Sequence, residues 1–299
     1  MIPTYNCLPF LEVAIRSVLS QALPAEQMQI EVVDDASTDG DVAALVERLG
    51  EGRVSYYRQP QNVGSLRNFE TCINRARGHY VHLLHGDDAV NPGFYAQIQD
   101  LFEHHPEAGA AYCRYAYIDE DGKRLYTQPA EKENTGVLDN WLLKIAGRNR
   151  IQYAAMVVKR AVYEKLGGFY GLEYGEDWEM WVRIAKQYPV AYTPEVLARY
   201  RKHQQSITGQ KFMSGSFLND LSAAMQMIQP HLPAPLRRKA LDEARRFYAL
   251  YGARMAHHVW HTTRNRQSAK AVLNRSLQMR KSFPACREAL KLHIKLAVQ

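Results

Sequence analysis

Two short apolar runs in the first third of the chain each lead into a pair of aspartates. Residues 29–33 precede Asp34-Asp35, and residues 79–84 precede Asp87-Asp88. A short apolar run bounded by polar residues is typical of a buried strand. Carboxylates crowded at a strand end repel one another unless a cation or ligand hydroxyls hold them. We therefore expect a sheet whose strand ends bind a ligand.

Strand and helix patterns alternate up to about residue 118. The predicted strands cover residues 30–34, 53–58, 80–84 and 108–118, and the predicted helices cover 8–21, 39–49, 65–76 and 92–104. Repeated βα units predict an α/β fold with a Rossmann-like, mainly parallel sheet and helices on both faces. Ligands of such sheets bind at the carboxyl ends of the strands, where both aspartate pairs fall.

The pattern changes after residue 118. It predicts a hairpin turn at 119–123 and a mobile connection at 129–150 that is first polar and then helical. Strands are predicted at 153–158 and 196–201, and helices at 159–166 and 176–187. Four further helices follow, at 214–229, 236–262, 266–280 and 284–297. We therefore predict one α/β domain over residues 1–210, with halves 1–118 and 119–210, and an all-helical extension over 211–299.

Charge is distributed unevenly along the 299 residues, although the net charge is only +7. From Lys211 onward there are 16 Lys and Arg against 4 Asp and Glu, so a slightly acidic body carries a basic extension. A basic helical segment predicts contact with an anionic membrane surface. The alternative is a solvated helical face without a specific partner, and no nucleic-acid partner is expected.

Cysteine usage and hydropathy indicate a reduced, cytoplasmic protein. Cys7, Cys72, Cys113 and Cys286 are far apart and form no CxxC pair, which argues against a disulfide framework or a zinc site. No apolar stretch reaches the length of a membrane span, and the first residues do not resemble a secretion signal.

The acidic pairs carry different candidate roles. Asp87-Asp88 after Gly86 can hold Mg²⁺ or Mn²⁺ against a diphosphate, although Gly-Asp-Asp is also a common turn. Asp35 can accept a hydrogen bond from a base imide, Asp34 can be structural, and Asp39 is expected to cap the helix at 39–49.

Glu176-Asp177 opens a predicted helix, where the helix dipole favours carboxylates. The apolar residues that follow, including Trp178, partly bury this position and offer a platform for a sugar face. A carboxylate in such a pocket can act as a general base with a raised pKa. His203 by itself is more often structural than a ligand.

Taken together, these segments resemble an inverting family 2 glycosyltransferase with the GT-A fold, of the bacterial cell-surface polysaccharide type. The matching motifs occur in family order over residues 1–208: Ile2-Pro3-Thr4-Tyr5-Asn6, Val33-Asp34-Asp35-Ala36-Ser37-Thr38-Asp39, Asn62-Val63-Gly64, Gly86-Asp87-Asp88, Gly175-Glu176-Asp177-Trp178 and Tyr200-Arg201-Lys202-His203.

The resemblance implies a role for each matching residue. The nucleotide-sugar donor would contact Pro3, Thr4, Tyr5, Asp35, Arg67 and Asp87. A divalent cation, Mg²⁺ or Mn²⁺, would be held by Asp88 and His203. Asp177 would be the catalytic base, and Glu176 and Trp178 would shape the acceptor pocket. The expected donor carries UDP rather than dTDP or GDP, and the expected acceptor is a saccharide or lipid-linked saccharide at the inner face of the cell membrane.

Two departures from the family pattern stand out. Only Met1 and Ile2 precede Pro3, which predicts a shortened first strand, and His85 occupies a position where many relatives have an aspartate. Two rival functions remain open. A nucleotidyltransferase would favour a glycine-rich phosphate loop in place of Pro3-Thr4-Tyr5-Asn6, and a non-catalytic sugar-binding relative would keep the fold without turnover.

Overall fold

The computed structural model describes residues 1–298. The chain forms two compact units. The first comprises Met1–Trp141, Ile151–Tyr170 and Gln187–Lys202, and the second comprises Leu142–Arg150, Gly171–Lys186 and the chain from His203 onward. The second unit therefore combines the helix that carries Asp177 with the C-terminal helices. The predicted domain boundary at residue 210 remains a prediction.

A parallel three-stranded sheet opens the first unit. Its strands β1 (Ile2–Thr4), β2 (Glu31–Asp34) and β3 (Ser55–Arg58) pair in the order β1-β2-β3. Helices α1 (Leu8–Leu19) and α2 (Val42–Gly50) connect them. In this register Thr4 lies opposite Asp34, and Asp34 lies opposite Arg58. Three polar side chains therefore meet at the carboxyl edge.

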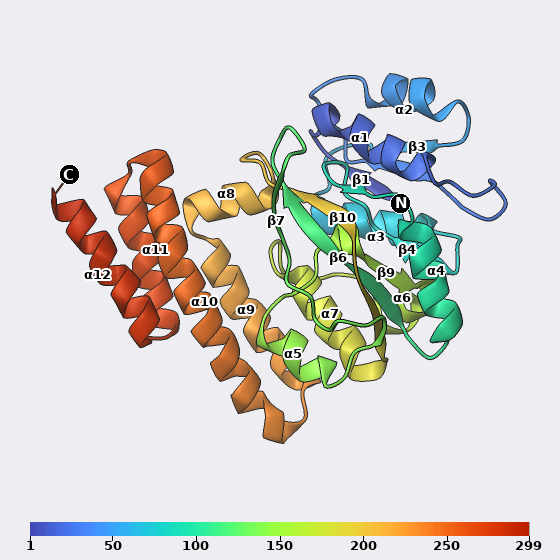
Figure 1. Cartoon of the computed structure of the whole chain (residues 1–299). Coiled ribbons are helices and arrows are strands. Elements are labelled where there is room, and N and C mark those ends of the chain that lie inside the picture. Colours follow the sequence, from blue (N-terminus) through green and yellow to red (C-terminus); the bar gives the residue numbers. More distant parts are fainter. Residues whose placement is uncertain (299) are drawn as a thin grey trace. The chain divides into compact units, whose positions relative to one another are not determined.

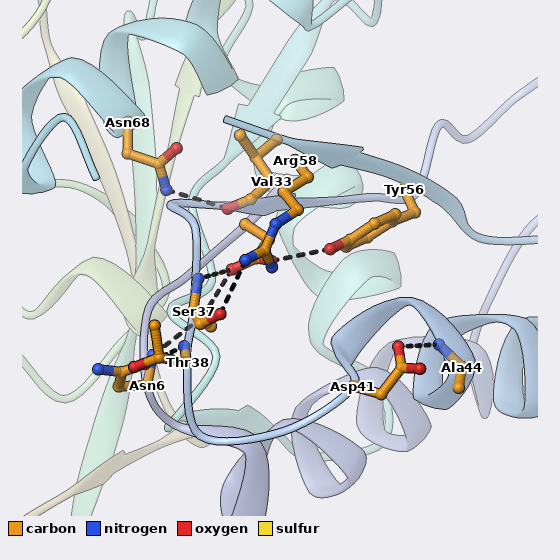
Figure 2. A network of polar contacts seen from close by, with 10 residues as sticks. Asn6, Val33, Ser37, Thr38, Asp41, Ala44, Tyr56, Arg58 and Asn68 are labelled. Carbon is orange, nitrogen blue, oxygen red and sulfur yellow. Dashed lines mark hydrogen bonds and ion pairs between the residues drawn. The ribbon is translucent and has the colours of Figure 1, made fainter. Parts of the chain in front are cut away.

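The prediction that Asp39 caps the second helix is wrong. The side chain of Asp41 caps α2 by accepting a 2.9 Å hydrogen bond from the Ala44 amide (Figure 2). Asp39 instead accepts from the amide of Leu8, the first residue of α1, at 2.8 Å. Asp41 has an extended backbone at the helix entry, the conformation that an N-cap requires.

The first unit also contains a seven-stranded mixed sheet; its strands β4, β6, β7, β9 and β10 are labelled in Figure 1. Its central path is β4 (Tyr80–His82), β9 (Met156–Lys159), β6 (Ala110–Ile118), β10 (Val190–Arg201) and β5 (Ala89–Val90). Strands β6 and β10 are parallel, whereas β9 is antiparallel to both β4 and β6. Strand β4 therefore runs in the same direction as β6, and β9 lies reversed between them.

Backbone hydrogen bonds extend the first sheet beyond β1. The amides of Leu84 and Gly86 donate to the carbonyls of Met1 and Pro3 at 3.1 and 3.0 Å, and the Met1 amino group donates to the His82 carbonyl at 2.9 Å. The segment after β4 thus lies beside β1. This pairing brings the Gly86-Asp87-Asp88 turn to the same edge as Thr4 and Asp34.

The remaining elements of the first unit complete its layers. The turn at 119–123 joins β6 to β7 in a hairpin, as predicted. Residues 129–150 contain a strand and a helix, and the last strand begins at Val190 rather than residue 196. The first unit also contains α3 (Ser65–Arg75), α4 (Phe94–His104), β7 (Arg124–Thr127), β8 (Gly136–Val137), η1 (Tyr153–Ala155) and α6 (Arg160–Leu166). Helix α5 (Trp141–Gly147) belongs to the second unit except for its first residue.

Helices dominate the second unit. It contains most of α7 (Glu176–Gln187), followed by α8 (Ile207–Ser214), α9 (Phe217–Ile228), η2 (Gln229–His231), α10 (Ala234–Thr263), α11 (Arg266–Met279) and α12 (Phe283–Val298). Helices α11 and α12 pack beside the long α10 (Figure 1). Buried alanines along α10, among them Ala249, Ala253 and Ala256, allow this close approach. Within the described residues, no helix combines the length and apolar character needed to span a membrane.

Candidate active site

Asp34 is the centre of a polar network at the carboxyl edge of the first sheet, and its partners Ser37, Tyr56 and Arg58 are labelled in Figure 2. It is fully buried, and its Oδ1 accepts from the amide and hydroxyl of Ser37 at 2.9 and 2.5 Å. Its Oδ2 accepts from the Tyr56 hydroxyl at 2.8 Å and from Arg58 at 2.5 Å. Both oxygens are occupied by protein donors, so Asp34 is structural.

Asn6 connects the loop after β1 to the loop after β2. Its Oδ1 accepts from the Thr38 amide at 2.8 Å, and its own amide donates to the Ser37 hydroxyl at 3.0 Å (Figure 2). Asn6 and Ala36 both have positive φ, at 46° and 58°. Left-handed backbone at a non-glycine residue is uncommon and persists where the surroundings enforce it. The two loops therefore hold each other in shape.

Asp35 links the second sequence motif to the third. Its Oδ1 accepts from the Val63 amide at 2.8 Å and its Oδ2 from the Gly64 amide at 3.0 Å. Burial raises the pKa of Asp35, although these two hydrogen bonds oppose the change. Each carboxylate oxygen has a second lone pair, so an additional donor can be accepted. The predicted contact with the base stays a prediction.

The other predicted donor contacts differ in accessibility. Pro3 and Thr4 are buried in β1, whereas Tyr5 is 49% exposed. Arg67 is exposed in the first turn of α3. Tyr5 and Arg67 are thus the two accessible members of this set, and the role of all four in donor binding remains a prediction.

Gly86 allows the Gly86-Asp87-Asp88 turn to pack tightly against β1 and α1. A Cβ at this position would lie 2.8 Å from Cys7 Sγ and 2.9 Å from Thr4 Oγ1. Such distances are shorter than van der Waals contact, so a larger residue requires movement of the surrounding structure. The absence of a side chain at Gly86 therefore sets the position of the following aspartates.

His85, Asp87 and Asp88 form a cluster suited to a metal ion. One ligand atom from each lies within 4.8 Å of the others. Asp88 is 1% exposed, and within the described residues its Oδ2 has no hydrogen-bond partner. Burial, and then the neighbouring Asp87, raise the pKa of Asp88 well above its usual value. A divalent cation would supply the missing counter-charge, so these residues fit the ion that the sequence predicts.

His85 was not assigned a role from the sequence. Its ring stacks on Phe69, with centroids 4.9 Å apart, and packs against Tyr153 at 4.5 Å. Burial lowers the pKa of His85, and its Nε2 is buried without a partner among residues 1–298. A neutral imidazole is a good ligand for transition metals. In the sequence, its position two residues before Asp87 was the signal that could have identified His85 as a candidate ligand.

Arg201, at the end of β10, holds Asp87 and Asp88 in position. Its amide donates to Oδ1 of Asp88 at 2.8 Å, and its Nε donates to the Asp87 carbonyl at 2.9 Å. Its Nη1 also donates to the carbonyls of Asp119 and Glu120, both at 2.8 Å. Arg201 is therefore a positioning residue. His203 begins the second unit, and its predicted role as a metal ligand is untested.

Asp177 lies in the first turn of α7 and is 8% exposed. Its Oδ2 accepts a 2.8 Å hydrogen bond from the Asn149 side chain, and its Oδ1 accepts from the Trp178 amide at 2.7 Å. Burial raises the pKa of Asp177 to about 6, with the Asn149 hydrogen bond as the largest opposing effect. Near neutral pH the group is mostly ionised yet retains appreciable basicity, as a general base requires.

Two residues that support Asp177 were not found from the sequence. Asn149 donates its backbone amide to the Tyr248 hydroxyl of α10 at 3.0 Å, and Tyr248 packs on the Trp178 ring at 5.2 Å. The C-terminal helices therefore contribute to the surroundings of Asp177. No motif could indicate this, because Asn149 and Tyr248 are about a hundred positions apart.

The predicted acceptor residues are both buried. Glu176 is 8% exposed, and Trp178 is fully buried with its indole N–H donating to the Ile145 carbonyl at 2.6 Å. An acceptor sugar would reach the Trp178 ring only if that ring became accessible. The acceptor-pocket role of both residues stays a prediction.

Comparison with known proteins identifies the family. Residues 1–167, more than half of the chain, match the family model described as Glycosyl transferase family 2. The chain therefore belongs to glycosyl transferase family 2, as the sequence motifs predicted.

The curated relatives include a protein named as a glycosyltransferase. An uncharacterised protein of Mycobacterium tuberculosis is 28% identical over 225 residues, which cover 71% of this chain and 69% of the relative. An uncharacterised glycosyltransferase of Rickettsia felis is 26% identical over 236 residues, which cover 74% of this chain and 38% of the relative. This chain thus spans well under half of the Rickettsia protein.

Solved structures confirm the predicted fold class. TarS of S. aureus in complex with UDP-GlcNAc superimposes with a TM-score of 0.67 at 15% identity, covering 93% of this chain and 80% of that chain. The mannosyltransferase PcManGT of Pyrobaculum calidifontis, in complex with GDP-Man and Mn²⁺, gives 0.61 at 18% identity, covering 100% and 79%. The α/β fold with a parallel sheet core and a helical C-terminal region is therefore of the GT-A type.

Proposed function

We propose that this protein is an inverting glycosyltransferase that moves a sugar from a nucleotide-diphosphate donor to a hydroxyl group of a saccharide or lipid-linked saccharide. Asp177 is the observation that carries the proposal. A buried carboxylate with a pKa of about 6 is poised to remove a proton at neutral pH. Membership of glycosyl transferase family 2 supports the reaction class.

Different residues of this chain have different roles in the proposed reaction. An oxygen of Asp177 takes the proton of the acceptor hydroxyl, and the acceptor oxygen attacks the anomeric carbon opposite the leaving diphosphate, so the configuration inverts. Asn149 holds the Asp177 carboxylate in one orientation. Asp88, Asp87 and His85 would hold Mg²⁺ or Mn²⁺, with His203 as a predicted additional ligand. A divalent cation supplies charge stabilisation for a leaving diphosphate.

The donor side of the proposal rests on Asp35, Tyr5 and Arg67. A carboxylate at Asp35 suits a base that presents a ring N–H donor, which uracil and thymine have at N3 and guanine has at N1. The similar structures of TarS and PcManGT were solved with UDP-GlcNAc and with GDP-Man, so both kinds of base occur within this fold. UDP remains our first choice.

The acceptor and location are inferred from the basic extension. We assign the reaction to cell-surface polysaccharide synthesis at the cytoplasmic face of the membrane, with the protein bound peripherally. The excess of positive charge after Lys211 supports contact with anionic lipid.

A panel of nucleotide sugars with UDP, dTDP and GDP tests the proposal. We expect Mn²⁺- or Mg²⁺-dependent release of nucleoside diphosphate from one donor, and loss of that release in Asp88→Asn. Release of pyrophosphate from a nucleoside triphosphate and a sugar phosphate would instead indicate a nucleotidyltransferase. Donor binding without turnover, whichever acceptor preparation is added, would indicate a non-catalytic relative.

A further inference from the structure

Helix α12 exposes an unusual apolar face at the C-terminal end of the second unit. Phe283, Leu290 and Ile294 are 82, 62 and 56% exposed, and their spacing of seven and four residues places them along one line of the helix. We call these three residues the apolar stripe. They account for three of the eleven large hydrophobic side chains that are exposed among the described residues, so the concentration on one short helix is not a general property of the surface.

The stripe is not the face by which α12 packs on its neighbours. The opposite side carries Ala285, Ala289, Leu292 and Leu296, which are buried where α12 packs against α10 and α11 (Figure 1). A helix on a protein surface normally has one apolar face and one polar face. The second apolar line on α12 therefore needs an explanation outside the fold.

A row of cations runs beside the stripe. Arg287, Lys291 and Lys295 follow one another at four-residue spacing, and all three are exposed; we call them the basic row. Glu288, the one acidic residue of α12, lies on the inner side of this row and contacts Lys291 at 3.0 Å and Arg287 at 3.6 Å. The outer surface of the helix thus combines apolar and positive groups, and its one carboxylate lies away from the stripe.

We infer that the outer face of α12 lies in the interfacial layer of an anionic lipid bilayer, with the apolar stripe inserted between headgroups and the basic row against lipid phosphates. An in-plane helix with an apolar line flanked by Lys and Arg is the arrangement that binds such surfaces. The surrounding chain strengthens the charge match, because 16 Lys and Arg against 4 Asp and Glu follow from Lys211 onward. A second copy of this chain would bring the same positive excess to the contact, which disfavours self-association as the explanation. This inference rests on the proposed peripheral membrane location and assigns the membrane contact to the outer face of α12.

The direct test is co-flotation of the full chain with vesicles. We expect wild type to float with phosphatidylcholine vesicles that contain phosphatidylglycerol, and much less with phosphatidylcholine alone. The substitutions Phe283→Gln, Leu290→Gln and Ile294→Gln together should weaken binding by at least about tenfold, because each removes an insertable side chain. These side chains are exposed, so the variant should keep the wild-type melting temperature.

A charge-matched comparison distinguishes a specific role of the basic row from the general electrostatic attraction between a positively charged chain and an anionic membrane. One variant carries Arg287→Gln, Lys291→Gln and Lys295→Gln, and the control carries Arg238→Gln, Lys239→Gln and Arg246→Gln on the exposed side of α10. Both lose three positive charges. We expect the α12 variant to lose binding at least several-fold more than the control, and equal losses would contradict a specific role for α12.

Cys286 provides an independent readout on the same helix. It is exposed, whereas Cys7, Cys72 and Cys113 are buried, so a polarity-sensitive fluorophore can be attached at Cys286 alone. Its emission should shift to the blue on addition of anionic vesicles. The inference is overturned if wild type does not float, if the stripe variant floats equally well, or if the stripe variant only converts a dimer to a monomer in light scattering. Donor turnover is measured in the same variants, because its retention with lost flotation separates this inference from the proposed reaction.

Discussion

The side chain of Asn149 donates a 2.8 Å hydrogen bond to Oδ2 of Asp177, and this contact opposes the rise in the pKa of Asp177 that burial causes. Asn149 is itself held by Tyr248 of α10. A side chain from outside every recognised motif thus tunes the proposed catalytic base, and it depends on the C-terminal helices to do so.

Replacing Asn149 should change the pH dependence of transfer. With Asp177 as base, the rate should fall as pH drops through about 6. Asn149→Ala removes a hydrogen bond that favours the ionised carboxylate, so the acidic limb should move to higher pH and the rate at pH 6 should drop on the order of tenfold. The measurement is the pH profile of kcat for wild type and variant. Asn274→Ala, at an exposed position of α11, should leave the profile unchanged, and an unmoved profile in Asn149→Ala would argue against this role.

Neutralising Asp177 should stabilise the fold near neutral pH. The folded protein holds a proton on Asp177 up to about pH 6, whereas the unfolded chain releases it near pH 4. Stability from this group is therefore present at low pH and lost as pH rises through that window. Asp177→Asn should gain about 1–3 kcal/mol relative to wild type between pH 4 and 7. Urea unfolding at both pH values measures this, with the exposed Asp121→Asn as control; a difference independent of pH would contradict the expected ionisation.

The identity of residue 85 should set the metal preference. An imidazole ligand suits transition ions better than it suits Mg²⁺, whereas carboxylates suit both Mg²⁺ and Mn²⁺. His85→Asp should therefore lower the ratio of Mn²⁺- to Mg²⁺-supported turnover by about tenfold. Metal titrations of nucleoside diphosphate release provide the measurement. The same ratio in both proteins would remove His85 from the metal site.

Gly86 should tolerate no side chain without loss of stability. In Gly86→Ala the new Cβ would meet Cys7 Sγ and Thr4 Oγ1, which should destabilise the protein by about 1–3 kcal/mol. The double variant with Cys7→Ala removes one of the two close contacts and should recover part of the loss. Equal stability of Gly86→Ala and wild type in urea would show that the turn moves freely away from β1.

The sequence predicted the fold through patterns that are local. Alternating strand and helix signals, and aspartates at strand ends, anticipated the parallel core and the edge where Asp34, Asp35 and Asp88 lie. The antiparallel β9 was predicted as a strand, but neither its reversed direction nor its place between β4 and β6 could be read from its residues, because strand order depends on contacts distant in sequence. The predicted N-cap of α2 was wrong because Asp39 and Asp41 are both suitable cap residues and are only two positions apart.

The sequence predicted those residues of the site that lie within recognisable motifs. Asp35 and Asn62-Val63-Gly64 were separate motifs, and the structure shows that the amides of Val63 and Gly64 hold the Asp35 carboxylate. Residues that act on a motif from outside were missed, since neither Asn149 nor Tyr248 resembles a known pattern. His85 was noted only as a departure, because its suitability as a ligand depends on burial and orphaned polar atoms that a sequence does not reveal.

The assignment of Asp177 as the base is tested most directly by comparing donor binding with transfer in Asp177→Asn. Isothermal titration gives the donor Kd, and NMR of the anomeric proton gives both the rate and the configuration of the product. We predict donor affinity within about twofold of wild type, and a kcat lower by about 10²–10⁴-fold, with an inverted product from wild type. Transfer by Asp177→Asn at near the wild-type rate, or a wild-type product with retained configuration, would contradict the account.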